Sequence, residues 1–496
     1  MTRIGGLQLI DLLGEGDSRR GVNEHDLKTA ISGITCDSRR VEKGFLFAAL
    51  PGMRLDGRTF IADAVERGAA AILTSEPVAS LHALADAQGV AVITDPQPRR
   101  RLAHMAARFF AAQPASVAAV TGTNGKTSVV WFLNQIWTRL GHRSGCLGTL
   151  GLMTPGDWQP GNLTTPDPVE LHRMLASLAR EGIDHLAMEA SSHGISQNRL
   201  DGVRIAAGAF TNLSRDHLDY HGSLDAYLKA KMRLFSELIA DGGAAVLCAD
   251  DPSAPKIEQE ARRRLRVVTY GRSGADLRLV DLQRKTDGQR LSVVLDGKTH
   301  EIEVPLVGDF QALNALCAAA LAWTMGADGS QALQALERLQ AVPGRLENVG
   351  SRDSGAAVYV DYAHTPDALQ AALTALRPFA TGRLFVVFGC GGDRDAGKRP
   401  EMGRIAAACA DQIYITDDNP RSEAPSIIRR QILAACPGAG EIADRAEAIR
   451  VAADSLGSGD ILLIAGKGHE TGQLVGDTRL PFDDREVAKA VLKELA

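Results

Sequence analysis

The chain is poor in cysteine, and its cysteines are not paired. Seven cysteines are spread over 496 residues, at positions 36, 146, 248, 317, 390, 409 and 436. This pattern has neither the close pairs of a zinc site nor the density of a disulfide-stabilised secreted domain, and both classes are excluded. We expect reduced thiols that serve mainly in packing, and a cytoplasmic protein.

Long apolar runs and an excess of positive charge are also missing. No stretch approaches the roughly 20 uninterrupted apolar residues of a membrane span, and residues 1–6 lack the apolar core of a signal peptide. Lysine and arginine number 55 against 60 aspartates and glutamates, which gives a net charge of −5. Neither a membrane span nor a nucleic-acid partner is therefore expected.

The composition that is present is that of an ordinary soluble globular protein. Hydrophobic residues make up 45% and charged residues 23% of the chain, which is enough apolar surface for several cores. The length is roughly three times that of a typical single domain. We expect three domains: a small N-terminal α/β domain (1–100), a central parallel-sheet domain (101–340) and a C-terminal Rossmann-like domain (341–496).

Apolar runs that alternate with helical stretches support this α/β fold class. The expected strands lie at 45–50, 70–74, 90–94, 117–120, 206–210, 358–361, 384–389, 412–416 and 460–465. A helix is expected at 127–140, with Gly141 as its C-terminal cap. In open parallel sheets ligands bind where strands end, so the loops after these runs are the first places to look for chemistry.

A glycine-containing loop, TGTNGKTS, follows the run at 117–120 and precedes the helix at 127–140. Backbone N–H groups and the positive end of a helix dipole can hold polyphosphate at such a position. Lys126 would reach the terminal phosphates and Thr127 could place its hydroxyl on Mg²⁺. Val120 stands where the common P-loop pattern has its first glycine. The candidate nucleotide-binding residues are Gly122, Thr123, Asn124, Gly125, Lys126, Thr127 and Ser128.

Three further segments carry candidate metal chemistry. Glu189 follows the apolar run at 183–187, where a carboxylate suits Mg²⁺. The polar segment 211–221, which includes His217, could equally be a solvated loop. Lys231 lies inside an expected apolar helix stripe made of Leu224, Tyr227, Leu228, Phe235 and Leu238. Either its stem extends so that the amine reaches water, or burial lowers its pKa and leaves a neutral amine able to take up CO₂ as a carbamate.

The loop TGTNGKTS resembles that of the muramyl-peptide ligase family, which also includes folylpolyglutamate synthase. The resemblance implies ATP as co-substrate and Mg²⁺ as cofactor, with Thr127, Glu189, His217 and Lys231 as metal-site residues. It also implies a CO₂-derived carbamate on Lys231. Lys126, Glu189, His217 and Lys231 would form the catalytic group.

The same resemblance extends to substrate-binding segments over most of the chain. It implies that Cys36 and Ser38 belong to a uridine-binding segment. Leu163 departs from the asparagine of some relatives, so a side-chain contact is not expected there. The muramyl-peptide contacts would be Thr164, Thr165, Ser191, Gln197 and Arg199, and the further nucleotide contacts Asn314, Arg345 and Asp361.

The string Asp418-Asn419-Pro420-Arg421 is, by itself, typical of an ordinary Asn-Pro turn. It also resembles the diaminopimelate signature of the family. Diaminopimelate differs from lysine by a distal carboxylate, and the planar guanidinium of Arg421 can bind a carboxylate through two hydrogen bonds. Three further residues, Arg394, Gly466 and Glu470, would hold the amino-acid end of the same substrate.

The resemblance implies a monomeric, ATP-dependent ligase that forms a peptide bond in peptidoglycan precursor synthesis. It would join meso-diaminopimelate to UDP-N-acetylmuramoyl-L-alanyl-D-glutamate through an acyl phosphate. The nearest alternative is a family member that adds lysine or another amino acid. A P-loop nucleotide-binding or motor protein and a noncatalytic scaffold are the alternatives from other classes, and both leave Lys231 and the DNPR string without a role.

Overall fold

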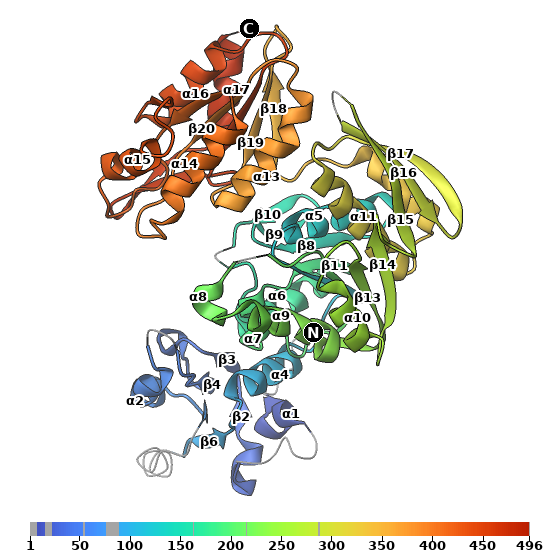
Figure 1. The fold of residues 1–496 in the computed structure, drawn as a ribbon. Coiled ribbons are helices and arrows are strands. Elements are labelled where there is room, and N and C mark those ends of the chain that lie inside the picture. Colours follow the sequence, from blue (N-terminus) through green and yellow to red (C-terminus); the bar gives the residue numbers. More distant parts are fainter. Residues whose placement is uncertain are drawn as a thin grey trace. The chain divides into compact units, whose positions relative to one another are not determined.

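The computed structural model describes residues 7–14, 22–52, 55–75, 89–161, 163–214, 216–285 and 288–495. The chain divides into two compact units. The first comprises Met1–Tyr270 with Ala320–Ala327, and the second comprises Gly271–Ala319 with Asp328–Ala496. Figure 1 colours the chain along its length and labels the elements of each unit.

The N-terminal part of the first unit is a small α/β arrangement, as predicted. Its four parallel strands run in the order β3-β4-β5-β6. Their apolar side chains share one core with helices α1 and α4. The strands β4, β5 and β6 are one or two residues shorter than the predicted runs. The bounds are β1 Leu7–Gln8, α1 Leu9–Leu13, β2 Ala30–Ile31, β3 Gly33–Thr35, β4 Phe45–Ala48, α2 Ile61–Glu66, β5 Ala71–Thr74, β6 Ala91–Thr94 and α4 Pro98–Phe110.

The central sheet of the first unit has the order β10-β9-β8-β11-β7-β12-β13-β14. Its six strands from β8 to β14 are parallel, whereas β9 and β10 form an antiparallel edge. The strand bounds are β7 Ser116–Thr121, β8 Ser144–Gly148, β9 Gly151–Thr154, β10 Asp157–Gln159, β11 His185–Glu189, β12 Ile205–Phe210, β13 Ile239–Cys248 and β14 Arg266–Gly271.

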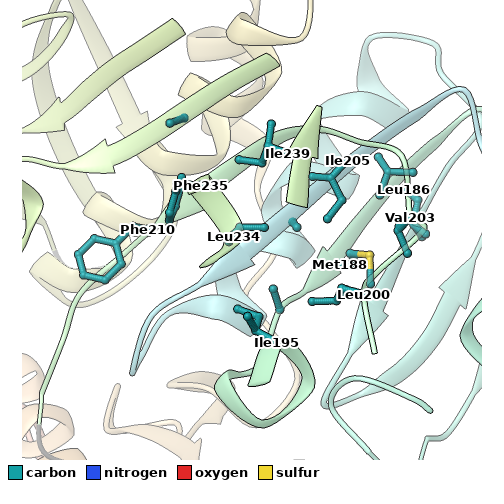
Figure 2. Packing of buried hydrophobic residues seen from close by; sticks show 14 of the residues in the cluster. Leu186, Met188, Ile195, Leu200, Val203, Ile205, Phe210, Leu234, Phe235 and Ile239 are labelled. Atoms are coloured by element: carbon teal, nitrogen blue, oxygen red, sulfur yellow. The ribbon is translucent and has the colours of Figure 1, made fainter. Parts of the chain in front are cut away.

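Helices cover this sheet and bury its apolar residues. Figure 2 shows Leu186 and Met188 of β11 in one cluster with Leu200 and Ile205. Helix α5 packs against β7, β8 and β11; Figure 1 labels α5, β8 and β11. The helix bounds are α5 Lys126–Arg139, α6 Pro168–Arg180, α7 Ser192–Ser196, α8 Leu218–His221, α9 Leu224–Arg233, η5 Leu234–Leu238 and α10 Ala254–Ala261.

Strand register explains why chemistry gathers at one edge of this sheet. Glu189 pairs with Val120, so the end of β11 lies beside the strand that leads into the glycine loop. The predicted helix after the loop is confirmed as α5. Gly141, with φ of +89°, follows its cap residue Leu140, as expected for a glycine at a helix end.

The second unit contains an antiparallel meander and a Rossmann-like sheet. The meander pairs β15 with β16 and β16 with β17. The sheet has the order β18-β19-β23-β20-β21-β22, parallel except for β18. One core holds residues of α13, α14 and α15, and a second core holds residues of α16 and α17. A sheet buried on both faces is typical of parallel α/β domains.

The bounds of this unit complete the chain. The strands are β15 Leu277–Lys285, β16 Gly288–Leu295, β17 Lys298–Val304, β18 Glu347–Ser351, β19 Ala357–Asp361, β20 Leu384–Phe388, β21 Gln412–Ile415, β22 Gly440–Glu441, β23 Ile461–Ala465, β24 Gly472–Val475 and β25 Thr478–Pro481. The helices are α11 Asp309–Thr324, α12 Gly329–Gln334, α13 Pro366–Leu376, α14 Lys398–Cys409, α15 Pro425–Leu433, α16 Arg445–Asp454 and α17 Asp484–Glu494. Among the described helices, none is both long enough and apolar enough to cross a membrane.

Candidate active site

The glycine loop after β7 is held in place by the segment that follows β12. The Thr211 hydroxyl donates to the Asn124 carbonyl at 2.6 Å. The Asn124 backbone N–H in turn donates to Oδ1 of Asn212 at 2.9 Å. Lys126 lies at the loop, where its Nζ donates to the carbonyls of Gly122 and Thr123 at 3.0 and 2.8 Å. The sequence predicted the loop but not the residues that brace it.

Gly122 is required at its position for steric reasons. Its φ is +149°, and a Cβ there would lie 1.9 Å from the Thr211 hydroxyl. A side chain would therefore push apart the loop and its bracing segment.

Glu189 is held at the end of β11 next to this loop. Its carboxylate is 1% exposed and accepts from the Thr127 hydroxyl at 2.9 Å and from the Thr149 backbone N–H at 2.8 Å. The structure thus brings together Thr127 and Glu189, two of the predicted metal-site residues. Two oxygen donors beside a phosphate-type loop fit Mg²⁺, a hard cation that prefers oxygen ligands.

Lys231 points its amine into the protein rather than to water. The side chain is 1% exposed, its Nζ donates to the Gly122 carbonyl at 2.7 Å, and Nζ lies 4.1 Å from the centre of the Tyr227 ring. Burial first, and the charge of Lys126 second, hold the pKa of Lys231 well below its ordinary value. The extended, water-reaching alternative is therefore wrong.

The apolar stripe that surrounds Lys231 is partly confirmed. Tyr227, Leu228 and Phe235 are buried, but Leu224 is 45% exposed. Leu224 is the first residue of α9, directly after the N-cap Ser223, and precedes the buried residues Tyr227 and Leu228 of that helix. The helix continues beyond Arg233 as a π-helical turn, η5.

His217 is only loosely connected to this group. It has a φ of +52° and its side chain is 46% exposed. Its ring lies 4.9 Å from that of His193 and 6.1 Å from that of Tyr227, between ring centres. Because Tyr227 also contacts Lys231, this ring is the link between His217 and the buried amine.

The predicted muramyl-peptide residues form one hydrogen-bonded group. Arg199 donates to the Thr165 carbonyl at 2.6 Å and to Oε1 of Gln197 at 2.7 Å. The hydroxyls of Thr165 and Ser191 lie 3.0 Å apart. Burial lowers the pKa of Arg199. Thr164 connects to the group that holds Glu189, because its hydroxyl lies 3.1 Å from that of Thr149.

The predicted uridine segment lies at the end of β3. Ser38 is buried, at 9% exposure. Cys36 is exposed at its surface, but desolvation by the protein groups around it, followed by the charge of Asp167, raises the pKa of its thiol to about 11. Asp167 is the N-cap of α6 and also acts electrostatically on Arg199. Cys36 therefore faces the same side of the first unit as the muramyl-peptide group.

In the second unit, the DNPR string after β21 is buried and interlocked with the segment after β23. Asp418 and Asn419 are 7% and 6% exposed. The Asn419 side-chain amide donates to the Glu470 carboxylate at 2.9 Å. Gly466 has a φ of +116°, and a Cβ there would lie 2.7 Å from Oδ2 of Asp418. These predicted amino-acid contacts are thus brought together.

Lys467 is a residue of this group that the sequence reading missed. It is 0% exposed, and its Nζ donates to Asn419 Oδ1, to Glu470 Oε2 and to the Gly472 carbonyl at 3.1, 3.1 and 2.7 Å. A buried lysine is stable only when such partners compensate its charge. Its position between Gly466 and Glu470, which are both predicted contacts, could have identified Lys467 from the sequence.

Arg421 is fixed by its backbone more than by its side chain. Its φ is +51°, its N–H donates to the Leu474 carbonyl at 3.1 Å, and its carbonyl accepts from the Gly476 N–H at 2.8 Å. The guanidinium donates to the Gly392 carbonyl at 2.8 Å. Arg394, the other predicted arginine, is exposed.

The predicted nucleotide contacts of the second unit have partners of their own. The Asn314 amide donates to Gln311 at 3.0 Å and is buried rather than solvated. Asp361 accepts from the N–H groups of Leu346 and Ala363 at 2.7 and 2.8 Å, and burial raises its pKa. Arg345 lies 4.5 Å from the centre of the Tyr362 ring.

A second group of side chains that could bind a metal lies at the N-terminal ends of β8 and β11, away from the glycine loop. Ligand atoms of His142, Asp184 and His185 lie within 4.8 Å of one another. The His185 ring nitrogen and the Asp184 carboxylate are already hydrogen-bonded at 2.8 Å, and the two histidine rings contact each other with centres 4.0 Å apart and planes tilted by 39°. These contacts account for the group as a local polar cluster.

Comparison with known proteins gives the family. Profiles described as "Mur ligase family, catalytic domain", "Mur ligase middle domain" and "Mur ligase, glutamate ligase domain" match residues 30–110, 120–322 and 344–468. The chain is 53% identical to the UDP-N-acetylmuramoyl-L-alanyl-D-glutamate–2,6-diaminopimelate ligase of Brucella melitensis over 94% of this chain and 95% of that one. It is 55% identical to the ligase of that name from Bradyrhizobium diazoefficiens, with 93% and 95% covered.

Solved structures agree with this assignment. A structure of a UDP-N-acetylmuramoyl-L-alanyl-D-glutamate–2,6-diaminopimelate ligase is 33% identical, covers 99% of both chains and has a TM-score of 0.73. Mycobacterium tuberculosis folylpolyglutamate synthase in complex with ADP is 19% identical, with a TM-score of 0.62 over 78% of this chain and 95% of that one, and is alike in fold alone. With three profiles matched in order and relatives above 50% identity along nearly its whole length, the chain belongs to the Mur ligase family.

Proposed function

We propose that this chain is an ATP-dependent ligase that joins meso-diaminopimelate to UDP-N-acetylmuramoyl-L-alanyl-D-glutamate in peptidoglycan precursor synthesis. The observation that carries the proposal is the high identity to diaminopimelate ligases across both units, together with an intact DNPR string held by Lys467 and Glu470. It works in the cytoplasm as a monomer, with domains at 1–100, 101–340 and 341–496.

The first chemical step activates the substrate acid. The γ-carboxylate of D-glutamate attacks the γ-phosphorus of ATP, a P–O bond breaks, and an acyl phosphate and ADP result. The loop N–H groups and Lys126 hold the phosphates during this transfer, which relies mainly on positioning and electrostatics. Thr127 and Glu189 would hold Mg²⁺, with His217 and a carbamate on Lys231 at a second ion. Bound Mg²⁺ supplies charge neutralisation for the phosphate oxygens.

The second step forms the amide. The amine of diaminopimelate attacks the acyl carbon, a tetrahedral intermediate forms, and phosphate leaves with the C–O bond electrons while the amine loses a proton. Asn419, Glu470 and Arg394 would orient the amino-acid end. Arg421 would bind the distal carboxylate that lysine lacks.

The remaining contacts divide between the other substrate and the nucleotide. Cys36 and Ser38 would bind the uridine, and the group around Thr165 and Arg199 would bind the muramyl peptide. Asn314, Arg345 and Asp361 would complete the nucleotide site.

The carbamate has its own test. A neutral, desolvated amine is the form that reacts with CO₂, and burial lowers the pKa of Lys231, which favours that form. Protein equilibrated with ¹³C-bicarbonate should give a carbamate carbonyl signal by NMR that Lys231→Met removes. A signal that persists in this variant would assign the carbamate elsewhere.

The function is tested by phosphate release from ATP with the UDP-muramyl dipeptide, adding meso-diaminopimelate or L-lysine in parallel, and by mass spectrometry of the product. We expect turnover with diaminopimelate alone. Turnover with lysine would favour the lysine-adding alternative. ATP hydrolysis that is independent of the dipeptide would favour a nucleotide-binding protein without ligase chemistry.

Arg421→Ala isolates the amino-acid site. We expect kcat/KM for diaminopimelate to fall by roughly 100-fold, because a charge-assisted pair is lost, while ATP affinity stays within about twofold. Arg450→Ala, which removes an exposed arginine paired with Glu447, is the matched control and should leave both unchanged. An equal loss of ATP affinity in Arg421→Ala would contradict the assigned role.

A further inference from the structure

We propose that Thr149 is a positioning residue that links the muramyl-peptide loop at Thr164 to the metal-holding carboxylate of Glu189. The inference rests on the proposed function and deepens it. It adds a residue that lies between two groups of the site and that sequence motifs did not identify.

Thr149 touches both groups directly. It lies in the turn between β8 and β9, where its backbone N–H donates to Oε1 of Glu189 at 2.8 Å and its hydroxyl lies 3.3 Å from Oε2. The same hydroxyl lies 3.1 Å from the hydroxyl of Thr164. One side chain thus contacts a predicted substrate residue and a predicted metal ligand.

The chemistry of the Glu189 carboxylate fixes the donor and acceptor in each of these hydrogen bonds. An ionised carboxylate only accepts hydrogen bonds, so the Thr149 hydroxyl donates its single proton to Glu189. The Thr164 hydroxyl must then donate to the Thr149 oxygen. The Thr164 oxygen then has only lone pairs to offer the substrate. It can accept a hydrogen bond from a substrate N–H but cannot donate one to a substrate acceptor.

The turn that carries Thr149 and the carboxylate of Glu189 are packed too closely to move independently. A Cβ on Gly148, the last residue of β8, would lie 2.2 Å from Oε1 of Glu189. The backbone that carries Thr149 therefore lies against the carboxylate with no room for an added atom. A shift of the turn that follows engagement of Thr164 must displace Glu189.

The link is tested with Thr149→Val, which keeps the side-chain shape and the backbone N–H but removes the hydroxyl. The readouts are Mn²⁺ affinity in the presence of ADP, measured by electron paramagnetic resonance, and KM for the UDP-muramyl dipeptide. We expect each to worsen by roughly tenfold, the lower end of the range for losing a group that orients a metal ligand. Thr149→Ser retains the hydroxyl and should stay within about twofold of wild type.

Thr138→Val is the matched control, because it removes a similar hydroxyl pair, with Ser144 at 2.9 Å, away from Glu189. It should change neither readout. A double variant, Thr149→Val with Thr164→Val, should lose less than the product of the two single losses, since both act through one chain.

The outcomes separate this inference from the proposed function. Wild-type turnover with diaminopimelate tests the function alone. If wild type is active and Thr149→Val keeps wild-type Mn²⁺ affinity and KM, the link is overturned and the function stands. If Thr149→Ser loses as much as Thr149→Val, packing rather than the hydroxyl is responsible, which also overturns it.

Discussion

The amine of Lys231 is out of water and close to another positive charge. It has one carbonyl partner, Gly122, and one aromatic face, Tyr227. Neither neutralises a full charge as a carboxylate would, which is why burial dominates and the pKa of Lys231 falls well below its ordinary value. An amine in this state costs the protein stability whenever it must be protonated.

This cost predicts a pH dependence of unfolding in CO₂-free buffer. Between the lowered folded pKa and the unfolded pKa of about 10.4, the unfolded chain binds a proton that the folded chain does not, so stability rises with pH. Lys231→Met removes the cost. We expect the excess of its urea midpoint over that of wild type to grow as pH falls from 10.4 and to become constant below the folded pKa.

Lys229→Met, on the exposed face of the same helix, controls for loss of a lysine. It should track wild type at every pH. A wild-type curve parallel to that of Lys231→Met across the range would mean that Lys231 titrates normally.

At the scale of elements, the phosphate loop depends on a second segment. β7 and α5 define where the loop begins and ends, but Thr211 and Asn212, about ninety residues later, close its other side. They follow β12, the strand next to β7 in the sheet. The loop conformation is therefore a property of two neighbouring strand ends rather than of the motif alone.

Gly122→Ala tests this dependence. The added Cβ would meet the Thr211 hydroxyl at 1.9 Å, and the backbone strain adds to the clash. We expect ATP affinity, measured by calorimetry, to fall roughly 10- to 100-fold, the equivalent of about 1–3 kcal/mol of strain. Gly141 also has a positive φ, +89°, but open space around it, so Gly141→Ala should keep wild-type affinity. Equal affinities for both variants would rule out the steric argument.

Features that depend on interactions between residues close in sequence could be predicted, whereas features that depend on distant segments could not. The strand, loop and helix around Lys126 depend on local pattern, and the prediction is confirmed. The burial of Lys231 was one of two alternatives, because a stripe alone does not say whether the amine finds water. Thr149 and Lys467 were missed because their partners are set by strand register and left-handed turns. Leu224 was wrongly predicted to belong to the buried stripe: it is the first residue of its helix and precedes the buried positions.

At the scale of the whole molecule, the thiols report on the fold. All seven cysteines lie among the described residues, where none forms a disulfide; five are buried, Cys409 is half-buried and Cys36 is exposed. Burial raises the pKa of Cys146 and of Cys390 to about 12. Since the thiolate is the reactive form, exposure and reactivity need not coincide here.

We therefore expect one rapidly reacting thiol, Cys409, when the native protein meets a thiol-specific disulfide reagent at pH 8. Cys36 should react slowly, because at a pKa of about 11 only about a thousandth of it is thiolate. All seven should react in guanidinium without reductant. Fewer than seven would reveal a disulfide, and several fast native thiols would contradict the buried cores.

The left-handed backbone of Arg421 has a consequence for how relatives are recognised across genomes. The arginine is held by Leu474 and Gly476 of the β24–β25 hairpin, some fifty residues downstream of its own tetrapeptide. Drift in that hairpin can redirect the guanidinium while the four letters stay the same. If the amino-acid substrate of a relative is inferred from the tetrapeptide alone, some relatives will therefore be assigned the wrong substrate. The sequence of the hairpin should be compared as well.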